Sequence, residues 1–206
     1  MQILPFLSYT AGMTDFKTSI SIIAILLTFI AYIPYVRDTL HGKTTPHIYT
    51  WFIWGLVTAI AFGLQVEGGA GVGSWVTFAV VIACFFVFLL GIRSGKKDIT
   101  NLDTIFFILS LIALFLWLIA KQPILSVILV SFTDILAFIP TIRKSWNKPY
   151  SETLFLYSLN SFRHGLSLLA LEHYSIVTYL YPLTWTFANA LFSIMLIVRR
   201  KQIGNK

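Results

Sequence analysis

Residues 31–37 read AYIPYVR and residues 137–143 read AFIPTIR. The two stretches share Ala, Ile, Pro and Arg at equivalent positions, at an offset of 106 residues. The same offset pairs Arg93 with Arg199. A match that recurs at one offset over most of a chain indicates an internal repeat.

Each of these stretches closes a long apolar run, and most of the chain consists of such runs. The sequence is 57% hydrophobic and 11% charged, which is too little charged surface for a soluble globule of 206 residues. The runs are continuously apolar rather than alternating, so they predict membrane helices and not barrel strands. We expect seven spans, at residues 19–37, 47–65, 74–92, 103–120, 124–142, 153–171 and 176–198.

The basic residues indicate the orientation of these spans. Seven spans would put only Lys17 and Lys121 on one side of the membrane. The other side would carry Arg37, Lys43, Arg93, Lys96, Lys97, Arg143, Lys144, Lys148, Arg199, Arg200, Lys201 and Lys206. Because basic loops stay in the cytoplasm, the bias predicts an outer N-terminus and a cytoplasmic C-terminus.

The same pattern divides the chain and suggests its compartment. Residues 1–18 read as a short non-cytoplasmic tail without a secretory signal, and Met13 is an alternative start to Met1. A multi-pass plasma membrane protein, in a bacterial inner membrane, fits the charge bias and the short loops, and a eukaryotic organelle membrane is the alternative. The net charge of +7 sits at span ends rather than in one patch, so we expect the lipid bilayer and no nucleic acid as partner.

The repeat defines the fold class, an all-α membrane protein. Residues 19–93 form one three-helix repeat and residues 123–199 the other, with an unpaired linker helix at residues 102–121 and a basic tail at residues 200–206. The odd linker makes the two repeats run in the same direction, related by an axis along the membrane normal. This parallel arrangement is typical of transporters.

A 3+1+3 arrangement with a proline near the cytoplasmic end of the first and fifth helices resembles the SWEET and PQ-loop superfamily. The resemblance covers nearly the whole chain, although Tyr35 and Thr141 stand where the motif has glutamine. It implies transport by alternating access, with Pro34 and Pro140 as hinges. It departs at the sixth helix, where Glu152 stands at the expected proline position.

Two ionisable residues lie in the middle of expected spans. Asp134 and Arg163 are costly in a membrane and fall at similar estimated depths, so we predict a buried ion pair between them. A purely structural role for this pair remains open. In the functional alternative, Arg163 holds an anionic group and Asp134 and His164 relay a proton or charge. His164 points about 100° away from Arg163 around the helix, so we expect the two not to share a partner.

Tryptophan and asparagine positions complete the expected binding site. The repeat offset pairs Trp54 with Asn160, and Trp185 stands one turn before Asn189. The SWEET-like resemblance implies central Trp and Asn residues, here Trp54, Asn160 and Asn189. With Arg163 and Trp185 they form the predicted substrate site for a small polar or anionic solute. Three other tryptophans near span ends predict an interfacial belt: Trp51, Trp75 and Trp146.

The sequence lacks the motifs of the enzyme and cofactor-binding classes that a membrane protein of this size could belong to. No HExxH or paired-cysteine motif is present, and the GGAGVG at residues 68–73 lacks the lysine of a phosphate loop. Residues 176–198 contain no lysine for a retinal Schiff base. We therefore expect no enzyme activity, cofactor or metal. A carrier remains the favoured function, and a non-transporting receptor, as KDEL receptors are, remains the alternative. Substrate, coupling and homo-oligomerisation stay open.

Overall fold

The computed structural model describes the backbone of residues 3–94, 99–120 and 122–204, and the side chains of 15–93, 99–116, 119 and 122–203. Lys96, Lys97, Lys121 and Lys206, which were counted in the charge bias, lie outside the described part. Within that part the chain is all-helical and contains no strand. Its α-helices are α1 (Ile3–Leu40), α2 (Ile48–Glu67), α3 (Ser74–Ser94), α4 (Asn101–Ala120), α5 (Pro123–Asn147), α6 (Leu154–Ala170) and α7 (Ile176–Gly204).

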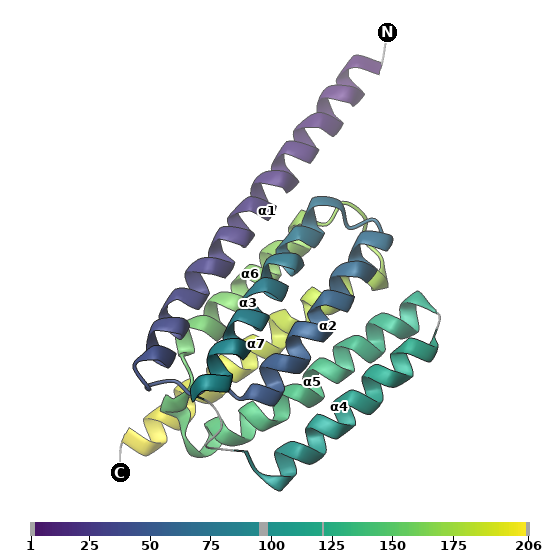
Figure 1. The fold of residues 1–206 in the computed structure, drawn as a ribbon. Coiled ribbons are helices and arrows are strands. Elements are labelled where there is room, and N and C mark those ends of the chain that lie inside the picture. The colour runs from purple at the N-terminus through teal and green to yellow at the C-terminus, as the bar shows by residue number, and fades with distance from the viewer. Residues whose placement is uncertain (1–2, 95–98, 121, 205–206) are drawn as a thin grey trace.

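The helices follow the predicted order and differ from the predicted spans mainly at their ends. The helix α1 begins at Ile3 instead of residue 19, and its N-terminal part projects beyond the rest of the bundle (Figure 1). The helices α5 and α7 continue past their apolar runs to Asn147 and Gly204. Lysine and arginine are good helix formers, so the basic residues after each run extend the helix.

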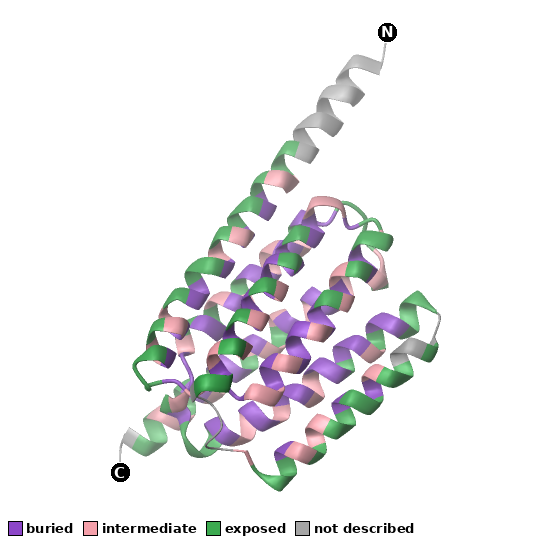
Figure 2. Cartoon of the chain, in the orientation of Figure 1, coloured by how far each residue is buried: buried purple, intermediate pink, exposed green. Residues whose placement is uncertain are grey.

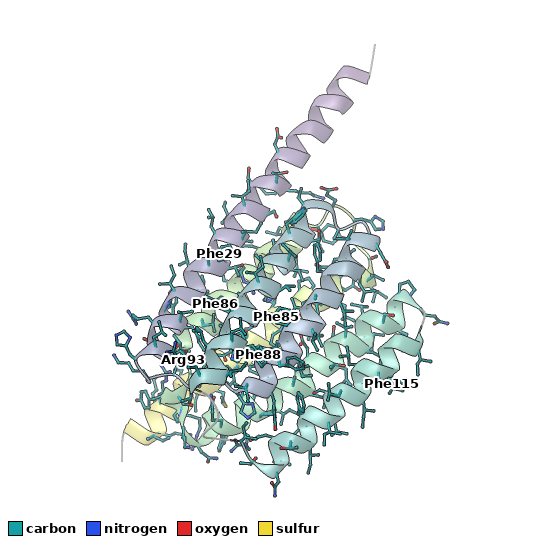
Figure 3. All side chains as sticks on the ribbon, in the orientation of Figure 1. Phe29, Phe85, Phe86, Phe88, Arg93 and Phe115 are labelled. Atoms are coloured by element: carbon teal, nitrogen blue, oxygen red, sulfur yellow. The ribbon has the colours of Figure 1, made fainter. Side chains whose placement is uncertain are left out.

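The outer surface of the bundle is apolar. Five helical segments are long and apolar enough to cross a bilayer: Asp15–Leu40, Ile48–Glu67, Gly71–Arg93, Pro123–Asn147 and Ile176–Ile203. Each helix turns its buried residues inward and its exposed residues outward (Figure 2). The exposed face carries large apolar side chains such as Phe29, Phe86 and Phe115, the last of them 61% exposed (Figure 3). The chain is therefore an all-α, membrane-embedded protein.

Two of the seven expected spans do not meet the same criterion of length and composition. The helix α6 has 17 residues, about 26 Å, and carries Asn160, Arg163 and His164. The apolar stretch of α4 among the described side chains is Asn101–Leu116. Both helices pack along longer neighbours, α6 against α1 and α7, and α4 against α5.

Six helices close into a ring. The helix α3 packs between α1 and α2, and α7 packs between α5 and α6. Two further contacts, of α1 with α6 and of α2 with α5, join these groups of three. The helix α4 lies outside the ring against α5, at its edge in Figure 1. The inner faces of the six helices thus surround a common centre.

The end of the ring near residue 70, called here the opposite end, is closed by two loops that pack together. The turn after α2 has two glycines with positive φ, Gly69 and Gly71. The amide of Val72 donates to Glu172 Oε1 (3.2 Å), and the amide of Glu172 donates to the carbonyl of Ala70 (3.2 Å). The segment expected as a turn from its glycines is therefore a turn held against the loop between α6 and α7.

Gly71 is the position in this turn where a side chain is least tolerable. Its φ is 58°, and a Cβ built there would lie 2.0 Å from Glu172 Cδ. We expect Gly71→Ala to lower the free energy of unfolding by about 1–2 kcal/mol, through backbone strain and loss of the Val72 hydrogen bond. Thermal unfolding in detergent measures this. The control Gly63→Ala, in open space on α2, should be neutral or stabilising by up to about 1 kcal/mol; equal losses in both would contradict the assignment.

Candidate functional site

A small cavity lies at the centre of the ring. Its polar lining residues are Thr58, Asn160, Arg163, His164 and Asn189. Aromatic and apolar residues complete the lining: Tyr32, Trp54, Val80, Cys84, Tyr181 and Trp185. The space that a water molecule can reach measures about 20 Å³, room for about one water molecule. Five of the ring's six helices contribute side chains to this central cavity.

The lining of the central cavity follows from helical spacing. Trp54 and Thr58 are four residues apart on α2, and Tyr181, Trp185 and Asn189 follow one another at the same spacing on α7. Side chains four residues apart share one face of a helix, which here is the face turned to the ring's centre. The Asn189 side-chain amide donates to the carbonyl of Trp185 (2.7 Å), which holds it on that face.

Arg163 is the most deeply buried charged group in the central cavity, with 0% of its surface exposed. Its Nε donates to Asn160 Oδ1 (3.2 Å), and its Nη2 donates to His164 Nε2 (2.8 Å). Among the described residues its Nη1 has no hydrogen-bond partner. A buried guanidinium without an anion is costly, so it marks the side of the cavity where a ligand would be stabilised most.

Asp134 lies on α5, behind the aromatic wall of the cavity. Its Oδ2 accepts hydrogen bonds from the Tyr181 hydroxyl (2.8 Å) and the Trp185 indole (2.7 Å). Thr58 lies 2.8 Å from the same Tyr181 oxygen, so a hydrogen-bonded chain joins α2, α7 and α5. Asp134 Oδ1 has no partner among the described residues. Hydrogen bonds thus link the cavity residue Thr58 to the carboxyl group, and a proton-relay role for Asp134 stays a prediction.

One sequence-based prediction about these charges is wrong. The ion pair between Asp134 and Arg163 does not form, because no carboxylate of the described residues lies within 4.0 Å of Arg163. The helix α5 packs against α2, α4 and α7, whereas α6 packs against α1 and α7, so similar depth does not bring the two side chains together. His164 Nε2 accepts a hydrogen bond from Arg163 directly, and the expectation that the two side chains do not share a third partner stays a prediction.

The five predicted substrate-binding residues, Trp54, Asn160, Arg163, Trp185 and Asn189, all line the central cavity. Their role in binding stays a prediction. The indoles of Trp54 and Trp185 meet edge to face, with ring centroids 5.0 Å apart. Sequence reasoning missed Tyr32, Thr58 and Tyr181. The spacing of four residues between Tyr181 and Trp185 is the signal that could have identified Tyr181.

Two of the three tryptophans expected in an interfacial belt lie on the outer surface, and the third is buried. Trp75 and Trp146 are both more than half exposed on the outer surface. Trp51 is 1% exposed, and its indole donates to the Tyr35 hydroxyl (3.1 Å). Its helix is rotated so that this position faces the ring's centre, and closeness to a span end therefore did not place it at the surface.

The end of the ring opposite the glycine turn, called here the basic end, is closed by a buried charge cluster. Lys144 Nζ lies 2.5 Å from Glu152 Oε1 and also donates to the carbonyl of Thr45. The Tyr157 hydroxyl donates to Glu152 Oε2 (3.0 Å). Beside it, the amide of Thr45 donates to the carbonyl of Ser151 (3.2 Å). This closure joins the α1–α2 loop to α5 and α6, and sequence reasoning missed it by treating Lys144 as a surface charge.

Pro34 and Pro140 lie inside α1 and α5, close to the basic end. Both helices remain continuous through the proline, where the residue removes one backbone hydrogen bond. A hinge role for either proline stays a prediction. The helix α7 contains a further proline, Pro182, which sequence analysis did not use.

A second charge cluster at the basic end attaches α4 to the ring. Arg143 binds Asp103 through Nε to Oδ1 and through Nη2 to Oδ2, each at 2.8 Å. His47, directly before α2, lies 3.4 Å from the same carboxylate without forming a hydrogen bond. Burial lowers the pKa of His47 from 6.5 to about 4. The negative charge of Asp103 raises this pKa, and the positive charge of Lys144 lowers it further.

The lowered pKa of His47 predicts acid sensitivity. The unfolded chain binds a proton on this histidine below about pH 6.5, whereas the folded chain does so only near pH 4. Stability from this group is therefore complete above pH 6.5 and falls as the pH drops, by about 2 kcal/mol at pH 5. Denaturant unfolding in detergent at pH 5 and 7.5 should show a smaller difference for His47→Gln. The exposed His41→Gln should keep the full difference; identical profiles for His47→Gln and the unmodified protein would contradict the prediction.

The described residues contain no group of three or more His, Cys, Asp or Glu side chains that could hold a metal ion. Comparison of the chain with protein-family models, curated proteins and solved structures gave no match. The function proposed next therefore rests on the ring, its central cavity and its two closures.

Proposed function

We propose that the chain is a seven-span membrane carrier built from two parallel three-helix repeats, with the 3+1+3 plan that resembles SWEET and PQ-loop proteins. The order of neighbours in the ring supports the repeat. Within each group of three, the last helix packs between the first two, and the first helix of each group packs on the second helix of the other. The unpaired α4 lies outside, as a linker would.

Two grooves on the outer surface give independent support for the repeat. The groove between α1 and α3 includes Phe29 and Val36, with a volume of about 490 Å³. The groove between α5 and α7 includes Ile135 and Ile142, with a volume of about 360 Å³. Phe29 pairs with Ile135, and Val36 pairs with Ile142, at the same offset of 106 residues that relates AYIPYVR to AFIPTIR. Equivalent helices thus leave equivalent gaps.

The observation that carries the proposal is the fully buried Arg163 in a cavity to which both groups of helices contribute. A buried cation without a partner anion has little structural benefit, whereas a central ionisable group at a repeat interface is where a carrier binds its solute. The ring has loop contacts at both ends, the Val72–Glu172 contact at one end and the Lys144–Glu152 cluster at the other. Opening one closure at a time would give alternating access.

The expected orientation belongs to the same proposal. We infer that the basic end faces the cytoplasm, since Arg37, Arg93, Arg143 and Arg199 lie there, and that the opposite end faces outward. A bacterial inner membrane suits this charge bias. The solute is small and polar or anionic.

The carrier proposal is tested by binding followed by flux. A thermal-shift screen of sugars, amino acids, nucleosides and organic acids identifies a ligand of the purified protein. Counterflow of that labelled ligand into proteoliposomes should then exceed the leak of empty liposomes and disappear in Arg163→Gln. Specific binding with no counterflow would favour the receptor alternative. A pH dependence of uptake that Asp134→Asn removes would assign the coupled proton to Asp134.

A further inference from the structure

The charges around the central cavity restrict its ligand. Arg163 is the one formally charged residue in the lining. The Asp134 carboxylate does not line the cavity, because Tyr181 and Trp185 stand between them and bind its Oδ2. Since His164 Nε2 accepts from Arg163, that nitrogen carries no proton and the imidazole is neutral. The cavity therefore presents a single positive charge.

The free hydrogen-bonding groups match a carboxylate. A guanidinium has five N–H groups, and Arg163 uses one on Asn160 and one on His164. Among the described residues Nη1 has no hydrogen-bond partner, so its two N–H groups are left for a ligand. A carboxylate is the strongest common acceptor for guanidinium N–H groups, so it is the ligand group that Nη1 fits best.

The rest of the lining fits a short, uncharged remainder. The indole of Trp54 and the phenol ring of Tyr32 provide flat apolar faces, beside Val80 and Cys84. Asn189 uses its amide nitrogen on the carbonyl of Trp185, so its oxygen is left to accept one hydrogen bond. The cavity has room for about one water molecule, so a ligand of even a few heavy atoms requires its lining to move apart, which favours a short ligand.

We propose that the central cavity binds a small monocarboxylate, with its carboxylate at Nη1 of Arg163 and its short carbon chain between Tyr32 and Trp54. That this ligand is transported rests on the proposed carrier function. That it binds depends on the cavity alone. A dicarboxylate would bury a second charge without a cation, and a zwitterion would bury an ammonium without an anion. A neutral sugar would leave Arg163 unpaired.

Propionate and its neutral isostere propionamide test this class directly. Purified protein in nanodiscs is titrated with each compound, and with malonate and alanine, while the fluorescence of the cavity tryptophans is followed. We expect saturable binding of propionate below about 10 mM, and binding of the other three weaker by at least about tenfold. Arg163→Gln should lose propionate binding by at least the same factor, and Arg163→Lys should retain part of it. Arg199→Gln, outside the cavity, should bind normally.

A second variant allows the same test if Arg163→Gln fails to fold. Asn160→Asp keeps the shape of the residue that accepts from Arg163 Nε and places a negative charge there. It should also abolish propionate binding. Absence of saturable propionate binding, or equal binding of propionamide, overturns the monocarboxylate proposal and leaves the carrier proposal standing. Propionate binding that depends on Arg163 without counterflow supports the ligand class and contradicts the carrier.

Discussion

Replacing Glu152 by Gln is expected to lower the free energy of unfolding by about 3–5 kcal/mol, the usual effect of removing one partner of a buried ion pair. Lys144 and Glu152 are both almost completely buried, and no other carboxylate of the described residues lies within 4.0 Å of the lysine. The variant leaves the ammonium facing only the carbonyl of Thr45 and a neutral amide. Denaturant unfolding in detergent, with the unmodified protein alongside, measures the loss.

Two further variants identify the cause of that loss of stability. The exposed Glu67→Gln, at the opposite end of the ring, should change the free energy by less than about 0.5 kcal/mol. Combining Glu152→Gln with Lys144→Met removes the stranded charge and should recover most of the stability. If the double variant is no more stable than Glu152→Gln alone, the ion pair is not what holds the basic end closed.

Weakening this closure is also expected to expose the central cavity. Cys84 is the chain's single cysteine and lines the cavity while almost completely buried, so its reaction with a hydrophilic thiol reagent reports opening. In bilayers, a charged methanethiosulfonate should modify the unmodified protein slowly. Glu152→Gln should react faster by at least about tenfold, because a closure weakened by several kcal/mol raises the open population.

The labelling rates of the variants can be compared only while every variant is folded. Labelling is done well below the midpoint of thermal unfolding of Glu152→Gln, with Cys84→Ser as the blank and Glu67→Gln as the matched control. The double variant with Lys144→Met should return to slow labelling. An unchanged rate in Glu152→Gln would mean that the cluster at the basic end stabilises the bundle without gating the cavity.

Hydropathy predicted the order of the helices, and the repeat offset, the mid-span positions and the SWEET-like resemblance predicted six of the eleven residues that line the cavity. A helix has fixed rise and rotation, so depth and face of one helix follow from its own sequence. The five predicted substrate residues therefore came together on the inner faces. The helix ends were less predictable, because basic residues continue α5 and α7 beyond the apolar runs that defined the spans.

Contacts between helices were not predictable in the same way. Asp134 and Arg163 share a depth, but the ring places α7 between their helices, so Asp134 binds Tyr181 and Trp185 instead. Trp51 lies near a span end, as a belt residue would, but its side chain points to the inside of the ring. Lys144 resembles any other basic residue after a span until the Thr45 loop and Glu152 cover it. Each of these depends on how neighbouring helices are rotated, which no single segment encodes.

The most direct test of alternating access is the sidedness of Cys84 modification in the unmodified protein. A membrane-impermeant thiol reagent is added to one face of oriented proteoliposomes at a time, with Cys84→Ser as the blank. The carrier proposal predicts that Cys84 is modified from either face, and more slowly from both when propionate is bound. Modification from one face only, under every condition, would contradict alternating access and identify the cavity as a one-sided binding site.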